Sequence, residues 1–288
     1  MIAVTGATGA IGGRVGRLLA DREQPLRLLV RDRGRAPRVE AEVAIIADYT
    51  DSDAAAAGLV GCDTMLLVSA RESADRVTEH RSMIDAAVAA GVGKIVYISF
   101  QSAAPDATFT FARDHFHTEQ LIASSGLEHV FLRDSLYHSG LVGLAGADGV
   151  IRGPAGDGAV AAVGHDDVAA VAAHVLSSSR WDGQTLDVTG PAALTLTEVA
   201  AELTAVSGRP VRYENESEDE AYASRAHYGA PRFEVQGWVT SYQAIATGEL
   251  ATVTKTVEQV TGRRPQSFAD SLAADPHLWS HLARTDRS

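Results

Sequence analysis

The sequence feature that most constrains the fold is a set of glycines directly after the first apolar run. Residues 2–4 read Ile-Ala-Val, which predicts a short buried strand, and Gly6, Gly9 and Gly12 follow at three-residue spacing. Apolar residues from Ile11 to Leu19 then recur at helical spacing. Strand, glycine turn and helix in this order predict a dinucleotide site, in which a helix N-terminus binds a pyrophosphate. The alternative is that the glycines only punctuate a turn.

Each glycine has a distinct purpose in such a site. Gly6 makes the tight turn, Gly9 lets the backbone approach the pyrophosphate, and Gly12 lets the helix pack close to the strand. The second apolar run, Leu26–Val30, predicts the strand whose end reaches the adenine ribose.

Arginines dominate the end of that second strand, at positions 31, 33, 35 and 38. An acidic residue there would hold the ribose hydroxyls of NAD, whereas arginines suit the extra phosphate of NADP because a guanidinium binds phosphate through two donors. Asp32 complicates the pattern, since it could contact a ribose hydroxyl, and an ordinary solvated loop is the other interpretation. We expect NADP, with Arg31 and Arg35 as its contacts and NAD as a possible cofactor.

Bulk composition limits the class of protein. A chain of 288 residues forms one large domain or two modest ones. The formal net charge of −12 argues against a nucleic-acid partner, because phosphate backbones need a basic face. Cys62 is the only cysteine, so no internal disulfide is possible. The sequence contains no apolar run long enough to span a membrane and no signal peptide, which predicts a cytoplasmic protein without membrane contact.

Continuous apolar runs alternate with helical patterns through the first half. Strands are predicted near residues 43–47, 64–68, 95–98 and 129–132, and helices at 51–57, 74–90 and 111–124. This pattern predicts a doubly wound parallel Rossmann sheet, with ligands outside the carboxyl ends of its strands. Those ends therefore nominate further cofactor contacts: Asp48, Val68, Ser69, Ala70 and Ser99.

The second half has a different character. Gly140–Gly158 is rich in glycine and alanine, which predicts a loop region over the site. A helix is expected at 166–177, a strand near 184–189 that returns to the sheet, and a helix at 196–206 capped by Thr195 or Thr197 and stopped by Gly208. We therefore divide the chain into a Rossmann domain, residues 1–139, and a smaller α/β C-terminal substrate-binding part, residues 140–288.

With these residues placed, the chain resembles the atypical short-chain dehydrogenases called NmrA-like, above all their NAD(P)H:quinone oxidoreductase and triphenylmethane reductase members. The motifs that carry the likeness extend over nearly the whole chain: Met1–Gly9, Leu29-Val30-Arg31, Ala47-Asp48-Tyr49, Leu66–Ser69, His115-x-x-x-Glu119, Leu132-Arg133 with Tyr137, Ala155-Gly156-Asp157-Gly158, and Leu194-Thr195-Leu196-Thr197. The resemblance implies that NADPH is held by Gly6, Thr8, Gly9, Ile11, Arg31, Arg35, Ser69 and nearby backbone such as Ala10. It also implies a substrate pocket between the loop after Tyr137 and the C-terminal part.

The catalytic pattern departs from that of ordinary short-chain dehydrogenases. Those enzymes use a tyrosine and a lysine four residues on, and no Tyr-x-x-x-Lys occurs in this chain; His115 and Glu119 stand on the corresponding helix instead. Reduction of a ketone needs that acid, whereas hydride addition to a quinone gives a phenolate with a pKa of about 10 and needs little acid help. His115, Ser99 and Tyr137 are the candidate catalytic residues, Tyr137 by stacking on a flat substrate. Each also has a purely structural interpretation, and the sequence nominates no metal site.

These features predict an NADPH-dependent reductase that transfers hydride to a quinone or related conjugated aromatic substrate. A narrower form is a tailoring enzyme of aromatic polyketide biosynthesis. The alternative, from a different class, is a non-catalytic NAD(P)-sensing regulator that binds a protein partner, because NmrA itself resembles these enzymes. We expect a monomer or a homodimer.

Overall fold

A seven-stranded sheet forms the centre of the computed structural model, which describes residues 1–283. Every neighbouring pair is parallel, and the order is β3-β2-β1-β4-β5-β6-β9. The strands are β1 (Ile2–Val4), β2 (Leu26–Val30), β3 (Glu42–Ile45), β4 (Thr64–Leu67), β5 (Lys94–Phe100), β6 (Glu128–Asp134) and β9 (Thr185–Val188). Chain order reverses between β1 and β4, which is the switch point where such sheets bind ligands. The predicted doubly wound parallel sheet is confirmed.

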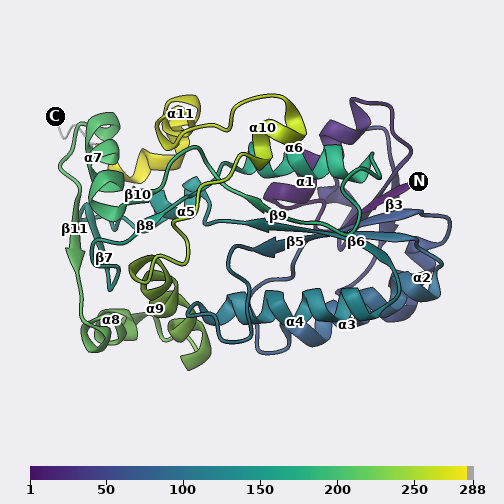
Figure 1. The fold of residues 1–288 in the computed structure, drawn as a ribbon, viewed down its shortest axis with the longest axis horizontal. Coiled ribbons are helices and arrows are strands. Elements are labelled where there is room, and N and C mark those ends of the chain that lie inside the picture. The colour runs from purple at the N-terminus through teal and green to yellow at the C-terminus, as the bar shows by residue number, and fades with distance from the viewer. Residues whose placement is uncertain (284–288) are drawn as a thin grey trace.

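Helices cover both faces of this sheet, which explains why its strands are continuous apolar runs. One layer contains α1 (Ala10–Ala20), α6 (His165–Leu176) and α10 (Thr256–Thr261), and the opposite layer contains α2 (Ser52–Leu59), α3 (Arg76–Ala89) and α4 (Thr110–Ser124) (Figure 1). Side chains alternate between the layers along β5: Val96 and Ile98 pack toward α1 and α6, whereas Ile95 and Tyr97 pack toward α3 and α4. This alternation fixes which way each strand-end side chain points.

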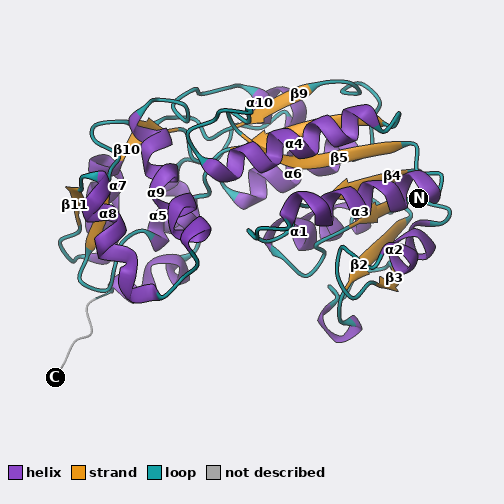
Figure 2. Cartoon of the chain, turned by 90° about the horizontal axis from the view of Figure 1, so that it is seen from below, coloured by secondary structure: helices purple, strands orange, loops and turns teal. Residues whose placement is uncertain are grey.

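The remaining elements form a second lobe, toward which the strands of the sheet point (Figures 1 and 2). Two small sheets stand in it, one pairing β8 with β10 and one pairing β7 with β11. Its elements are α5 (His138–Gly143), β7 (Val150–Gly153), β8 (Ala159–Val160), β10 (Leu194–Thr195), α7 (Leu196–Ser207), β11 (Arg212–Asn215), α8 (Glu218–Arg225), α9 (Arg232–Ala246) and α11 (Phe268–Ala274). Short 3-10 turns lie at Arg33–Arg35, Ala226–Tyr228 and Pro276–Leu282.

Local sequence signals set the ends of α7. The Thr195 hydroxyl accepts from the Glu198 N–H, and the Glu198 carboxylate accepts from the Thr195 N–H, so the two residues form a capping box. Gly208 ends the helix at a φ of 66°, in the left-handed region that glycine adopts without strain. Of the two predicted caps, Thr195 is the one used, and the predicted stop at Gly208 is confirmed.

The predicted loop over Gly140–Gly158 is wrong. The segment contains most of α5 and all of β7, and β7 pairs with β11, more than fifty residues later in the chain. Val150 and Ile151 are buried, while the glycines serve a tight turn in which the Gly149 N–H donates to the Gly146 carbonyl at 2.8 Å. The glycines therefore indicate a single turn before a short strand. That strand could not be predicted from its own sequence because its partner, β11, lies far along the chain.

Elements after residue 139 contribute to both parts of the molecule. Besides β9, the helices α6 and α10 pack with the sheet, and α5 spans the point at which we divided the chain. The division into two parts therefore remains a prediction. Among residues 1–283, no helix is both long and apolar enough to cross a membrane.

Candidate cofactor and substrate site

The turn between β1 and α1 has the geometry that a pyrophosphate requires. Gly6 has a φ of 57°, and the Gly9 N–H donates to its carbonyl at 2.8 Å. A Cβ on Gly12 would lie 2.4 Å from the Gly6 oxygen, so only glycine lets α1 begin this close to β1. Residues 8–10 are exposed, the Ile11 side chain is buried in the core, and no side chain caps α1. The first N–H groups of the helix are thus available to phosphate oxygens.

Three strand ends are tied together beside this turn. The Val68 N–H donates to the Thr5 hydroxyl at 2.9 Å, and the Tyr49 hydroxyl lies 2.9 Å from the Thr5 oxygen and 2.8 Å from the Val68 carbonyl. Burial raises the pKa of Tyr49 to about 12, so its hydroxyl keeps the proton it donates. Asp48 lies next to this group at the surface, where its carboxylate accepts from the Thr50 N–H at 2.7 Å. The contact with Val68 fixes the backbone where a cofactor would pass.

In the charged segment after β2, some side chains are hydrogen-bonded to the backbone and others point into solvent. Asp32 caps the following turn, because its carboxylate accepts from the Gly34 N–H at 2.8 Å, and Arg33 donates to the Val43 carbonyl at 3.0 Å. Arg31 and Arg35 are exposed, and neither guanidinium makes a hydrogen bond or ion pair with another residue among 1–283. The competing interpretation of Asp32 as a ribose ligand is thereby weakened, and both predicted phosphate contacts remain available.

Arg31→Ala is expected to weaken NADPH binding about tenfold or more, and NADH binding much less. A lost charge-assisted hydrogen bond to the 2′-phosphate costs about 1.5–3 kcal/mol. Titration calorimetry with both cofactors measures the two Kd values, and Arg33→Ala is the matched control because that guanidinium is already committed to Val43. Equal losses for NADPH and NADH would assign Arg31 to another contact, such as stacking on adenine.

Two side chains of α3 hold the backbone after β4, where Val68, Ser69 and Ala70 were predicted to meet the cofactor. The Ala70 N–H donates to His80 Nε2 at 2.8 Å, and Arg76 Nε donates to the Ala70 carbonyl at 3.0 Å. Since His80 Nε2 accepts, its proton is on Nδ1, which lies 2.8 Å from the Thr118 hydroxyl; burial lowers the pKa of His80 to about 3. The sequence analysis missed both residues, although their four-residue spacing puts them on one helix face.

Ser99 points away from any ligand at the strand ends. It is fully buried, lies on the face of β5 that packs on α4, and its hydroxyl donates to Glu119 Oε1 at 2.6 Å. Arg133 of β6 donates to both oxygens of the same carboxylate, at 2.8 and 2.6 Å. This geometry gives Ser99 a structural hydrogen bond and no free hydroxyl for catalysis or for the cofactor, so those two roles stay predictions that the structure does not favour.

His115 is likewise enclosed. It is 6% exposed, its Nδ1 lies 2.9 Å from the Tyr97 hydroxyl, and its ring packs near Phe100. Burial, helped by the charge of Arg76, holds the pKa of His115 well below its usual range, so the ring is neutral. Glu119, one turn further on, binds Arg133 and Ser99 instead of His115. His115 and Glu119 therefore do not interact with each other: His115 binds Tyr97, and Glu119 binds Arg133 and Ser99.

Tyr137 stacks on a residue of this chain. Its ring lies on His165, with centroids 4.1 Å apart and an interplanar angle of 25°, and its hydroxyl donates to the Asp134 carboxyl group. Burial raises the pKa of Asp134 to about 8, so this carboxyl is mostly protonated at neutral pH. Tyr137 stands half-buried just past the end of β6, which keeps it a candidate for substrate contact.

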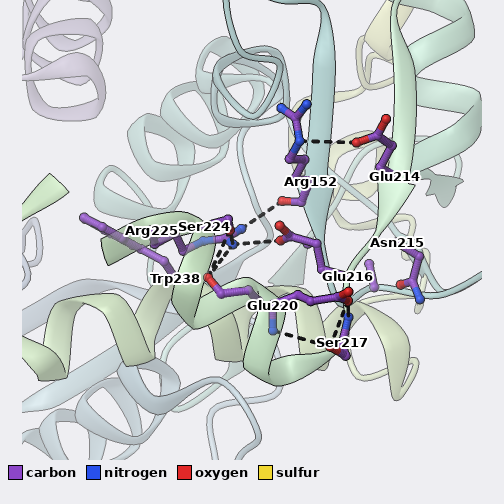
Figure 3. Close-up of polar contacts among 12 residues, drawn as sticks. Arg152, Glu214, Asn215, Glu216, Ser217, Glu220, Ser224, Arg225 and Trp238 are labelled. Carbon is purple, nitrogen blue, oxygen red and sulfur yellow. Dashed lines mark hydrogen bonds and ion pairs between the residues drawn. The ribbon is translucent and has the colours of Figure 1, made fainter. Parts of the chain in front are cut away.

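A small apolar cavity of about 90 Å³ lies between α5 and α9. Tyr242, which the sequence could not place, is in its lining with Leu136, Gly140, Leu141, Leu144, Ser241 and Ile245. Arg225 stacks over the Tyr242 ring at 5.1 Å and donates to the Arg152 carbonyl and the Glu216 carboxylate, at 2.8 and 3.0 Å (Figure 3). These contacts join β7, α8 and the segment after β11 to Tyr242 in the wall of the cavity.

Comparison with known proteins agrees with this geometry. Residues 6–179 match the family model described as NAD(P)H-binding. The chain belongs to the NAD(P)H-binding family. It is 34% identical to quinone oxidoreductase 2 of Escherichia coli K12 over 97% of this chain and 99% of that protein, and 34% identical to an NAD(P)H azoreductase of Xenophilus azovorans over 95% of this chain and 97% of that protein.

Solved structures of relatives extend this assignment within the NAD(P)H-binding family. The E. coli quinone oxidoreductase in complex with NADPH superposes with a TM-score of 0.87 at 33% identity, covering 95% of this chain and 99% of that one. The NADP(H) complex of Citrobacter sp. triphenylmethane reductase gives a TM-score of 0.83 at 26% identity, with the same coverage. The predicted NmrA-like resemblance, the NAD(P)H cofactor class and the NAD(P)H-dependent oxidoreductase class are confirmed.

Proposed function

We propose that this member of the NAD(P)H-binding family is an NADPH-dependent reductase that transfers hydride to a quinone or a related conjugated aromatic electrophile. The observation that carries the proposal is that neither His115 nor Glu119, the pair that stands in place of the usual tyrosine and lysine, is a free acid: His115 is neutral and buried, and Glu119 is bound to Arg133 and Ser99. A quinone suits such a site, because hydride addition gives a phenolate with a pKa of about 10, which water can protonate later. The quinone and azo substrates in the names of two relatives support the same class.

The residues of this chain would hold the cofactor at three points. The glycine turn and the start of α1 would bind the pyrophosphate, Arg31 and Arg35 the 2′-phosphate, and the backbone of residues 68–70 the nicotinamide half. When bound, NADPH supplies the hydride. A narrower form of the proposal makes the quinone an aromatic polyketide, whose reduction prepares a ring for hydroxylation.

Anaerobic mixing with NADPH tests the proposal. The panel contains simple quinones, a polycyclic aromatic quinone, an azo dye and a triphenylmethane dye. We expect the NADPH absorbance to fall in step with hydroquinone formation for at least one quinone. Tight NADPH binding without oxidation by any member of the panel would favour the non-catalytic sensor, and a polycyclic quinone as the best substrate would support the polyketide form.

His115→Ala is expected to keep kcat on the best quinone within about tenfold of the wild type. A true general acid contributes about 10²–10⁴-fold, so its loss would be plain. Tyr97→Phe is the matched control, because it removes the same hydrogen bond and leaves the imidazole in place. The measurement is kcat at saturating quinone and NADPH. A fall of a hundredfold or more in His115→Ala alone, with NADPH binding intact, would make His115 the catalytic acid.

A further inference from the structure

Arg76 is a buried charged side chain to which the proposed reaction assigns no role. It stands in the first turn of α3 and is only 6% exposed. One donor, Nε, is committed to the Ala70 carbonyl at 3.0 Å. Another donor, Nη1, is buried and has no hydrogen-bond partner among residues 1–283. A buried N–H without an acceptor is costly, so a side chain held this firmly with one free donor requires an explanation.

The charge of Arg76 is not held in a direct ion pair, although it acts on the nearby carboxyls of Glu72 and Asp114 and opposes the rise that burial gives to their pKa values. It forms no ion pair with any carboxylate in the described part of the chain, although buried guanidinium groups are normally paired. Its charge acts on Tyr97 of β5, on Asp134 at the end of β6 and on His115 of α4, and in each case it lowers the pKa by less than burial changes it. The guanidinium is therefore close to the carboxyl ends of β5 and β6, on the side where α4 would carry the acid in ordinary short-chain dehydrogenases.

Arg76 and His80 both hydrogen-bond to Ala70, which fixes the position of the Arg76 side chain. His80, one turn further along α3, accepts from the N–H of the same Ala70 whose carbonyl accepts from Arg76. Both polar groups of the Ala70 peptide are thus held by α3, and His80 is itself fixed by Thr118. A guanidinium held in this way pays little reorganisation when charge develops beside it.

We propose that Arg76 binds the quinone oxygen on which negative charge develops, with Ala70 and His80 as positioning residues. This inference rests on the proposed function. The quinone accepts a hydride, and with it two electrons, from NADPH, which becomes NADP⁺. One carbonyl oxygen becomes a phenolate that accepts a hydrogen bond from Arg76 Nη1, and the anion later takes a proton from water to give the hydroquinone. Arg76 thereby supplies charge stabilisation without donating a proton, which fits a site in which neither His115 nor Glu119 is free to donate one.

Arg76→Gln is the decisive variant. The glutamine Nε2 stands the same number of bonds from the backbone as the arginine Nε, so it can keep the hydrogen bond to the Ala70 carbonyl while the charge and Nη1 are lost. Loss of one oxyanion donor reduces kcat by about 10²–10³, and we expect that loss on a quinone. A cationic triphenylmethane dye forms no oxyanion at its reacting carbon, so the ratio of kcat on the quinone to kcat on the dye should fall by about the same factor.

Two further variants separate charge from position. Arg76→Lys keeps a charge and should recover part of the quinone rate, whereas Arg76→Met removes charge and support together and should be the slowest of the three. His80→Ala should lower kcat on the quinone, and His80→Gln, which retains an acceptor for the Ala70 N–H, should lower it less. NADPH affinity by fluorescence titration, and the unfolding midpoint, are measured for every variant.

Several outcomes would overturn the inference. Wild-type kcat on quinones in Arg76→Gln would show that Nη1 does not bind the substrate. A loss of NADPH affinity that accounts for the whole effect, or equal losses on quinone and dye, would assign Arg76 to an oxygen of the cofactor or to the fold. If the wild-type enzyme is inactive on every quinone, the proposed function itself is refuted. The wild type is therefore assayed before any variant.

Discussion

Gly9→Val is expected to abolish NADPH binding while the protein still folds. Gly9 has a φ of −93° and a ψ of −178°, an extended conformation that valine adopts readily, and an added Cβ would make one tight contact, 3.2 Å from the Gly6 oxygen, which a small shift of the turn relieves. The residue is exposed at the start of α1, so the new side chain would project into the space that the pyrophosphate needs. We expect Kd for NADPH to rise at least about 100-fold, equivalent to about 2.8 kcal/mol.

The control for this substitution is Gly143→Val, the same chemical change at an exposed glycine of α5 around which a Cβ meets no atom within 4 Å. It should bind NADPH as the wild type does. Gly12→Ala gives the opposite contrast, since its Cβ would collide with backbone and destabilise the turn itself. Unfolding midpoints distinguish the two kinds of loss. An unchanged Kd in Gly9→Val would mean that the cofactor phosphates bind elsewhere.

The geometry of the glycine turn could be predicted from the sequence because its determinants are local. Gly6, Gly9 and Gly12 act through backbone geometry within one turn, and Arg31 and Arg35 are fixed by their position after a strand. The conformations follow from steric rules that hold wherever the spacing occurs. The structure was needed only to show which charged residues after β2 bind the backbone, such as Asp32, which caps the following turn.

The catalytic half was less predictable because side-chain direction and partners are set by tertiary packing. Alternation along β5 puts Ser99 on the same face as Tyr97, toward α4, and that part could have been read from the sequence. The partner of Tyr137 could not, since His165 belongs to a later helix. The clamp on Ala70 by Arg76 and His80 was also hidden, because neither residue type nor spacing tells which backbone a buried side chain will reach.

Glu119→Ala is expected to lower the free energy of unfolding by about 3–5 kcal/mol, the usual cost of removing one partner from a buried ion pair. Glu119 is 2% exposed and binds Arg133 through both carboxylate oxygens. Its removal leaves the guanidinium without the carboxylate it binds, with only the more distant charge of Asp187 nearby, and the buried Ser99 hydroxyl without its acceptor. Urea unfolding at pH 7 measures the change, and Asp166→Ala is the matched control, because its ion pair with Arg14 is exposed and should contribute less than about 1 kcal/mol.

A double variant, Glu119→Leu with Arg133→Leu, tests whether the pair stabilises the protein or only avoids a penalty. Apolar side chains of similar volume often replace a buried ion pair at little cost, so the double variant should be more stable than Glu119→Ala alone. Such a result would mean that the ion pair is retained for what it positions, namely α4 against the ends of β5 and β6. If the double variant instead loses as much stability as the two single changes added together, the pair has no coupling, and Glu119 and Arg133 must act through separate contacts.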